Sequence, residues 1–245
     1  MRIPENSFLR TTPIAHRGLH DIKRRIPENS YAAYDAAIAE NYAIEIDVRF
    51  TKDGRLIVFH DDVLDRLTEG KGAPIEKTYE QLQELHLQGT EQKIPDFSEM
   101  LEYIDGRAPL LIELKNVPER GDLVEKTLQV LKGYKGEFAL QSFNPKYVYQ
   151  MRKQAPDILR GQLACFPSPE DRLPAVQRWA VKNMPLHFLA KPDFISYNIA
   201  NLPFKKAKKK DVLLIGWTAR TNEEYLRVKD YTDNIIFEYI RPEKL

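Results

Sequence analysis

The sequence of 245 residues lacks an excess of charge of either sign. It contains 37 lysine and arginine residues against 36 aspartate and glutamate residues, which gives a formal net charge of +1 at pH 7. Proteins that bind nucleic acids are in general strongly basic, so this balance argues against a nucleic-acid partner. Charged residues make up 30% and apolar residues 42% of the chain, a composition typical of a globular protein rather than a disordered one.

Cysteine and long apolar runs are nearly absent as well. Cys165 is the one cysteine of the sequence, so no internal disulfide can form, and we expect a cytoplasmic protein. No apolar run approaches the roughly 18 residues that a membrane-spanning helix needs. The opening residues MRIPENSFLRTTP contain no apolar signal segment. We therefore expect a soluble protein without stable insertion in a membrane.

One short run departs from the even mixture of charges. Residues 205–210 read KKAKKK, with five lysines in six positions. Such a run can bind an anionic membrane or a nucleic acid, or it can be a solvated end of a helix. No amphipathic segment flanks the run in the sequence, which favours the solvated helix end.

Short apolar runs rich in β-branched residues alternate with helical patterns along the whole chain. This alternation predicts a parallel sheet covered by helices. Ser30 precedes an alanine-rich helical pattern, and Pro145 stands at the first position of another, as helix starts require. The strand candidates are Ile14–Gly18, Ala43–Phe50, Leu56–His60, Leu110–Lys115, Phe138–Phe143, Leu159–Ala164, Phe194–Ile199, Val212–Thr218 and Asn234–Tyr239.

The third candidate strand follows a turn signal, Thr-Lys-Asp-Gly, at positions 51–54. A crossover between parallel strands needs a dozen or more residues, so Leu56–His60 must return antiparallel as the second arm of a hairpin. A turn centred between Lys52 and Asp53 places residues whose numbers sum to 105 opposite each other. Glu45 then faces His60.

Eight parallel strands remain after the hairpin arm is set aside. Their number and the chain length predict an α/β fold, a TIM-like (β/α)8 barrel, which takes about 250 residues. We expect a single domain over residues 1–245. The stretch Asp61–Arg107 exceeds a normal connection and contains helical patterns at Glu76–Leu87 and Ser98–Ile104, so it is interpreted as a small helical insertion.

Three polar clusters lie where predicted parallel strands end, at the face that carries the active site of a barrel. Side chains at i and i+2 of a strand point to the same face, so three carboxylates can converge there. Hard oxygen ligands suit Mg²⁺ or Ca²⁺, and two neighbouring histidines are candidate acid and base. The clusters are His16-Arg17, Glu45-x-Asp47 with His60-Asp61 returning beside it, and Glu113-x-Lys115.

Each cluster alone has an ordinary structural interpretation. A His-Arg pair is commonly a surface pair, an acid-x-acid strand is commonly a solvated face, and Glu-x-Lys is commonly a salt bridge. The position of all three at one end of apolar strands favours a functional site, because buried charge is costly unless it is paired or bound to a metal.

The string AHRGLHDIKRRIPENSYAAYDAAIAENYAIEIDVRFTKDGRLIVFHD strongly resembles the glycerophosphodiester phosphodiesterase family. The family motifs His-Arg-Gly, Pro-Glu-Asn, Glu-x-Asp-Val, Thr-x-Asp-Gly and His-Asp follow one another in this order. The later features that fit are Leu64-x-Arg66, Thr68-x-Gly70, Ile94-Pro95, Glu113-x-Lys115, Ser142-Phe143 and Trp217-Thr218.

The resemblance implies a TIM-like barrel that hydrolyses glycerophosphodiesters, small-molecule substrates, to glycerol 3-phosphate and an alcohol. It implies that a divalent cation is bound and that the glycerol 2-hydroxyl attacks phosphorus to give a cyclic phosphate that water then opens. The sequence itself leaves open whether water attacks directly. Transferred position by position, it makes His16 and His60 the general acid/base pair, Arg17 and Lys115 the phosphate contacts, Glu45, Asp47 and Glu113 the metal ligands, and Glu28 and Asn29 residues that hold the loop after the first strand.

The last two strands depart from the family pattern. Arg220 stands where a small polar residue is usual, and Glu238 stands about where a late aspartate is expected. Trp217 either contacts the glycerol or headgroup or packs as core at the barrel mouth. Two alternatives stay open: a lysophospholipase D on the same barrel, and a non-catalytic barrel that only binds glycerophosphodiesters.

Overall fold

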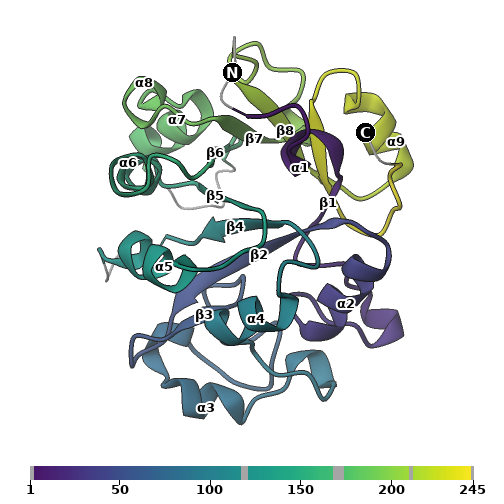
Figure 1. Cartoon of the computed structure of the whole chain (residues 1–245), viewed down its shortest axis with the longest axis vertical. Helices are drawn as coiled ribbons and strands as arrows, with labels where there is room; N and C mark the ends of the chain where they lie inside the picture. The colour runs from purple at the N-terminus through teal and green to yellow at the C-terminus, as the bar shows by residue number, and fades with distance from the viewer. Residues whose placement is uncertain (1–2, 117–120, 168–173, 210–211, 244–245) are drawn as a thin grey trace. The chain divides into compact units, whose positions relative to one another are not determined.

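The computed structural model describes residues 3–116, 121–167, 174–209 and 212–243. The chain divides into two compact units. The first-half unit is Ala15–Phe138, and the second-half unit joins Met1–Ile14 to Ala139–Leu245. Strands and helices alternate along the chain in both units, and the colours of Figure 1 follow this order from the N-terminus to the C-terminus.

The first-half unit is built on β2 (Ala43–Phe50), which is buried along its entire length. Strand β2 pairs parallel with β4 (Leu110–Leu114) and antiparallel with β3 (Leu56–Val58). The helix α2 packs against β2, and α4 packs against β3 (Figure 1). The helical segments of this unit are η1 (Ile22–Arg24), α2 (Tyr31–Ala39), η2 (Pro74–Glu76), α3 (Tyr79–Gln83), η3 (Leu87–Gly89), α4 (Phe97–Ile104) and α5 (Leu123–Leu131).

The hairpin between β2 and β3 exists as expected, but its predicted register is wrong by one residue. Val48 lies opposite Val58, so the paired numbers sum to 106 and not to 105. The turn holds three residues instead of two: the Thr51 N–H donates to the Arg55 carbonyl at 3.0 Å, and Gly54 has φ +79°. A three-residue hairpin loop needs a left-handed residue at this position, and glycine takes it without strain.

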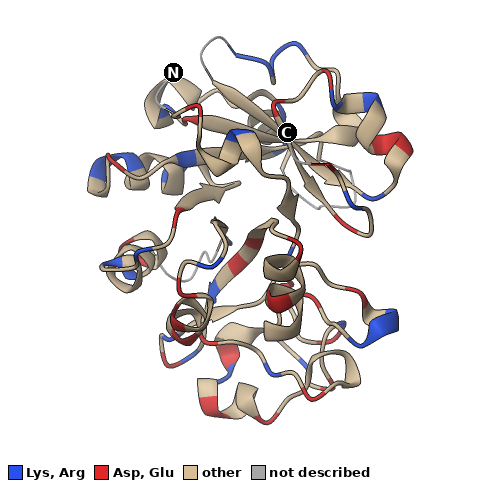
Figure 2. Cartoon of the chain, turned by 45° about the vertical axis from the view of Figure 1, so that its right-hand side comes forward, with Lys and Arg blue, Asp and Glu red and all other residues tan. Residues whose placement is uncertain are grey.

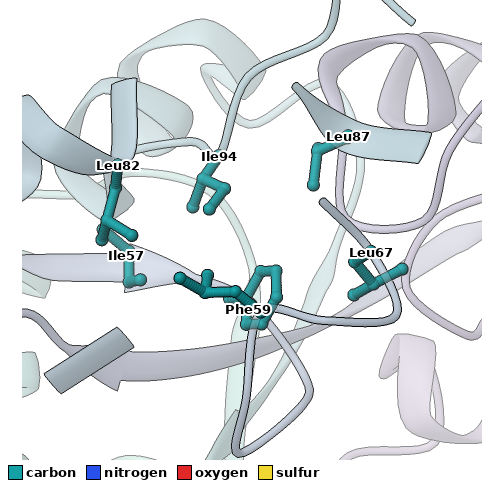
Figure 3. Close-up of a cluster of buried hydrophobic side chains, with 7 residues drawn as sticks. Ile57, Phe59, Leu67, Leu82, Leu87 and Ile94 are labelled. Carbon is teal, nitrogen blue, oxygen red and sulfur yellow. The ribbon is translucent and has the colours of Figure 1, made fainter. Parts of the chain in front are cut away.

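The insertion has a hydrophobic cluster of its own, which Figure 3 shows. The helix predicted at Glu76–Leu87 is shortened to α3, because the backbone is extended at Lys77 (φ −119°, ψ 144°) before it and at His86 (φ −115°, ψ 139°) after it. Burial of the cluster fixes β3 and the residues after it beneath α3. The cluster consists of Ile57, Phe59, Leu64, Leu67, Leu82, Leu87 and Ile94.

The second-half unit contains consecutive parallel strands. Strand β6 pairs with β5 and β7, and β8 pairs with β7 and β9. The helix α6 agrees with its predicted bounds, whereas α1, α7 and α8 have no counterpart among the patterns singled out in the sequence. The elements are α1 (Phe8–Thr11), β5 (Phe138–Ser142), α6 (Pro145–Gln154), β6 (Arg160–Ala164), α7 (Ala175–Asn183), α8 (His187–Ala190), β7 (Phe194–Asn198), η5 (Ile199–Asn201), β8 (Leu213–Ala219), α9 (Asn222–Val228) and β9 (Asn234–Phe237).

The fold class predicted from the sequence is confirmed. With β1 (Ile14–Ala15), the chain supplies eight parallel strands separated by helices, and β3 is the additional antiparallel arm. Strand β1 is shorter than predicted because Arg17 (φ 56°) and Gly18 (φ 77°) turn the chain out of the extended conformation. In the described residues, no helix is both long and apolar enough to cross a membrane. The single domain remains a prediction.

Candidate active site

Three carboxylates meet inside the first-half unit. Glu45 and Asp47 lie two residues apart on β2, and Glu113 lies on β4 with its Cα in register with that of Asp47. One oxygen of each carboxylate lies within 4.8 Å of the others, and all three residues are buried. The parallel register of two neighbouring strands therefore brings the three predicted ligands to one point.

The surroundings of the two acids on β2 shift their pKa values in opposite directions. Burial raises the pKa of Glu45 well above its ordinary value, and the Asp47 and Glu113 carboxylates raise it further. Burial also opposes ionisation of Asp47, but the charge of Lys115, with further help from the histidines and Arg17, lowers its pKa. Asp47 is therefore ionised, while Glu45 keeps its proton unless another cation joins the cluster.

The donor set of this cluster fits a divalent cation. Buried Asp47 Oδ1 accepts no hydrogen bond, and Lys115 Nζ lies 3.4 Å away from it. Clustered carboxylate oxygens are the ligands that Mg²⁺ and Ca²⁺ prefer. A cation held by Glu45, Asp47 and Glu113 would supply the positive charge that these groups lack.

Two basic side chains border the acidic cluster. The backbone N–H of Arg17 donates to Glu45 Oε2 at 3.1 Å, and Arg17 Nε lies 3.7 Å from Asp47 Oδ2. Lys115 Nζ lies 2.9 Å from Glu113 Oε1. Burial lowers the pKa of Lys115, but the Glu113 and Asp47 carboxylates outweigh this and raise it. Both side chains stay charged, which suits them to bind phosphate.

The two predicted acid/base histidines lie in the same unit. His16 follows β1, and its Nε2 is 3.8 Å from Glu45 Oε2. His60 follows β3, and its Nδ1 is 2.7 Å from Asp61 Oδ1. A carboxylate on Nδ1 holds the proton of a neutral imidazole there, which leaves Nε2 for proton transfer.

Arg66 links the carboxylate beside His60 to the carboxylate beside Arg17, a role that the sequence does not reveal. Its guanidinium donates to both oxygens of Asp61, at 2.6 and 2.8 Å, and to both oxygens of Glu28, at 2.8 and 2.9 Å. Glu28 in turn accepts from Arg17 at 2.6 Å. A continuous chain of charged hydrogen bonds thus runs from His60 to Arg17. Burial opposes ionisation of Asp61, but hydrogen bonds from Arg66 and His60 lower its pKa.

The loop after β1 is held by direct contacts to the site. Asn29 has a left-handed backbone (φ 51°), and its Nδ2 donates to Asp47 Oδ2 at 3.0 Å. The Asn29 N–H donates to the Arg17 carbonyl at 2.9 Å. A side chain at Gly18 would overlap Ala33 of α2, so glycine allows this loop to lie directly on the helix.

Trp217 lies in the second-half unit, unlike the seven other predicted site residues. Its indole N–H donates to the Ser196 carbonyl at 3.0 Å, and its ring meets Phe143 edge-on at 5.6 Å. Its substrate role stays a prediction beside the core alternative. The two departures from the family pattern pair with each other: Arg220 Nε lies 2.8 Å from Glu238 Oε2.

Comparison with known proteins identifies a family for most of the chain. The model of the glycerophosphoryl diester phosphodiesterase family matches residues 16–238. A glycerophosphodiester phosphodiesterase of Caldanaerobacter subterraneus subsp. tengcongensis is 30% identical over 93% of this chain and 94% of its own. Glycerophosphodiester phosphodiesterase 1 of Homo sapiens is 26% identical over 88% of this chain and 73% of its own.

Solved structures share the fold. A phosphodiesterase of Oleispira antarctica, solved with the product sn-glycerol-3-phosphate, superposes with a TM-score of 0.76 at 23% identity, over 92% of this chain and 91% of its own. A glycerophosphodiester phosphodiesterase of Parabacteroides distasonis gives a TM-score of 0.74 at 24% identity, over 93% and 92%. The chain belongs to the glycerophosphoryl diester phosphodiesterase family and is a phosphodiesterase.

Proposed function

We propose that this chain hydrolyses glycerophosphodiesters to glycerol 3-phosphate and an alcohol with a divalent cation, Mg²⁺ or Ca²⁺, held by Glu45, Asp47 and Glu113. The observation that carries the proposal is the buried acidic triad, in which burial and neighbouring carboxylates raise the pKa of Glu45. The Oleispira antarctica phosphodiesterase of the same fold, solved with the product sn-glycerol-3-phosphate, supports the substrate class.

The basic residues suit the charge of the substrate. A phosphodiester carries one negative charge at neutral pH, and more charge develops on its non-bridging oxygens as phosphorus is attacked. The bound cation would supply Lewis-acid stabilisation of that charge. Arg17 and Lys115 would bind the same oxygens, because both are charged and lie beside the triad.

The histidines suit proton transfer on the two sides of phosphorus. One imidazole would take the proton of the attacking hydroxyl, and the other would give a proton to the leaving alcohol. The Asp61 carboxylate would keep His60 in the tautomer that presents Nε2. Arg66 would keep Asp61 ionised and fixed.

Release of glycerol 3-phosphate from a panel of glycerophosphodiesters tests this function. We expect turnover by the wild-type chain and losses of about 100-fold or more for His16→Ala and for His60→Ala. His86→Ala is the matched control, since His86 also pairs with a carboxylate (Glu69, 2.9 Å) but lies in the insertion outside the cluster. Near-normal kcat in either catalytic variant would refute the acid/base roles.

Two substrates distinguish the proposed glycerophosphodiester phosphodiesterase from the alternative lysophospholipase D. Preference for lysophosphatidylcholine over glycerophosphocholine would indicate the lysophospholipase D activity. Negligible turnover of every substrate, together with measurable affinity for a glycerophosphodiester, would indicate the binding-only barrel.

A further inference from the structure

Helices α7 and α8 present large apolar side chains to solvent. Val176 and Trp179 of α7 are 76% and 56% exposed, and Phe188 of α8 is 67% exposed. Leu186 and Leu189 beside Phe188 are exposed as well. These five side chains are among the twelve large apolar side chains that are exposed in the described residues. Such a concentration on two short helices marks an interaction surface.

The backbone beneath these side chains is well anchored. The Tyr197 hydroxyl donates to the Lys182 carbonyl at 3.0 Å, and Arg152 of α6 donates to the Leu189 carbonyl at 2.6 Å. Met184 and Ala190 are buried between these contacts. The apolar face is therefore held outward by the packing of the helices that carry it.

Positive charge predominates in the segment that carries this apolar face. Residues 174–209 contain seven lysine and arginine residues against one acid, Asp193. The Asp193 carboxylate lies 3.8 Å from Arg160 and is itself buried, so it does not offset the surface charge. The segment thus departs sharply from the mixed charges that Figure 2 shows over both units.

The fold brings two lysines of the run, Lys206 and Lys209, to these helices. Lys206 Nζ donates to Asn183 Oδ1, at the end of α7, at 2.8 Å. At the start of α8, burial lowers the pKa of His187, and the charge of Lys209 lowers it further. The sequence-based prediction of a merely solvated run missed this neighbourhood, since α7 and the run are separated by more than 20 residues. Lys210 lies outside the described residues.

We propose that the face formed by Val176, Trp179, Leu186, Phe188 and Leu189, together with Lys206 and Lys209, docks reversibly on anionic lipid bilayers. Aromatic and aliphatic side chains enter the headgroup boundary, and the lysines add attraction to anionic lipids. The complementarity of charge decides the occupant. A second copy in a two-fold dimer would place the same cationic surfaces against each other, which is unfavourable.

Co-sedimentation with large vesicles tests the docking surface. We expect binding to vesicles of phosphatidylcholine with about one-third phosphatidylglycerol, weak binding to phosphatidylcholine alone, and release as salt rises from about 0.1 to 0.5 M. The double variant Trp179→Ser, Phe188→Ser should bind at least about tenfold more weakly. Leu226→Ser is the matched control, because Leu226 is 55% exposed on α9.

A fluorescence measurement follows Trp179 in the wild-type protein and does not depend on the folding of the double serine variant. Subtraction of the Trp179→Phe spectrum from the wild-type spectrum isolates Trp179, whose emission should shift to the blue on anionic vesicles. An unchanged emission, or equal binding of wild type and double variant, would overturn the proposal. So would a wild-type dimer that does not bind vesicles and that the double variant converts to a monomer.

Discussion

At the scale of single residues, two acids on one strand have opposite tendencies. Glu45 and Asp47 point to the same face of β2, yet burial and repulsion raise the pKa of Glu45, whereas Lys115 and its neighbours lower that of Asp47. The difference arises because the two cations near the cluster cannot compensate three buried carboxylates. A bound cation would remove the reason for Glu45 to keep its proton.

Glu45→Gln should therefore stabilise the cation-free protein at about pH 8. A raised native pKa means that Glu45 contributes full stability below its unfolded pKa and loses this contribution as pH rises through the native value. In EDTA we expect a gain of about 1 kcal/mol, or about 2–4 °C in Tm. Near pH 4 the difference between variant and wild type should shrink. Lower stability of the variant in EDTA at the higher pH would contradict the assigned charge state.

Arg66→Gln should lower kcat by about tenfold or more with a smaller change in KM, because Asp61 would lose the cation that fixes it against His60. Arg66→Lys should rescue little, since one ammonium cannot reproduce the fork that binds two carboxylates. Arg55→Gln is the matched control: Arg55 also binds two carboxylates, Asp96 and Glu99, and is similarly half-exposed. Equal kcat in the Arg66 and Arg55 variants would show that Arg66 has no positioning role.

The convergence of the acidic triad could be predicted from the sequence, but the contacts of Arg66 with Asp61 and Glu28 could not. Glu45 and Asp47 share a face because of the period of a strand, and their partner Glu113 ends the neighbouring parallel strand. Glu28 comes from the irregular segment between η1 and α2, and Asp61 and Arg66 come from the loop after β3. No periodicity relates such segments, so their contacts emerge only when the loops are folded.

At the scale of elements, boundaries that depend on local chemistry were predictable. Asn144 caps α6 through its side chain, and Pro145 starts that helix where the pattern placed it. The hairpin was predictable, but its register was not. In the three-residue turn Thr51 pairs with Arg55, whereas in the expected two-residue turn it would pair with Gly54. Exposed apolar residues of α7 have the spacing of a buried face, so their exposure could not be read from the pattern.

Gly161→Ala in β6 should destabilise the protein by about 1–3 kcal/mol, measured by urea unfolding. An added Cβ would overlap the ring of Phe194, which is fully buried on β7 and cannot move aside. Gly121→Ala is the control, because a Cβ there meets no neighbouring atom. Phe194→Leu should relieve part of the loss in the double variant. A neutral Gly161→Ala would show that this part of the sheet is loosely packed.

At the scale of the whole molecule, the alternation of strands and helices was sufficient to predict the fold class. Each unit contains parallel strands separated by helices, and the comparisons extend the same fold over most of the chain. The proposed ligands, phosphate contacts and histidines all belong to the first-half unit, whereas the proposed membrane-docking face belongs to the second-half unit. None of the residues of that face is among the predicted site residues, so its variants should leave turnover of a water-soluble substrate unchanged.

Turnover of glycerophosphocholine after removal of metal is the most direct test of the central claim, that the triad Glu45, Asp47 and Glu113 holds a catalytic cation. We expect that EDTA abolishes release of glycerol 3-phosphate, that Mg²⁺ or Ca²⁺ restores it, and that Asp47→Asn stays inactive at every cation concentration. Full release by the wild-type chain in EDTA would contradict the claim, as would an Asp47→Asn variant with wild-type cation dependence.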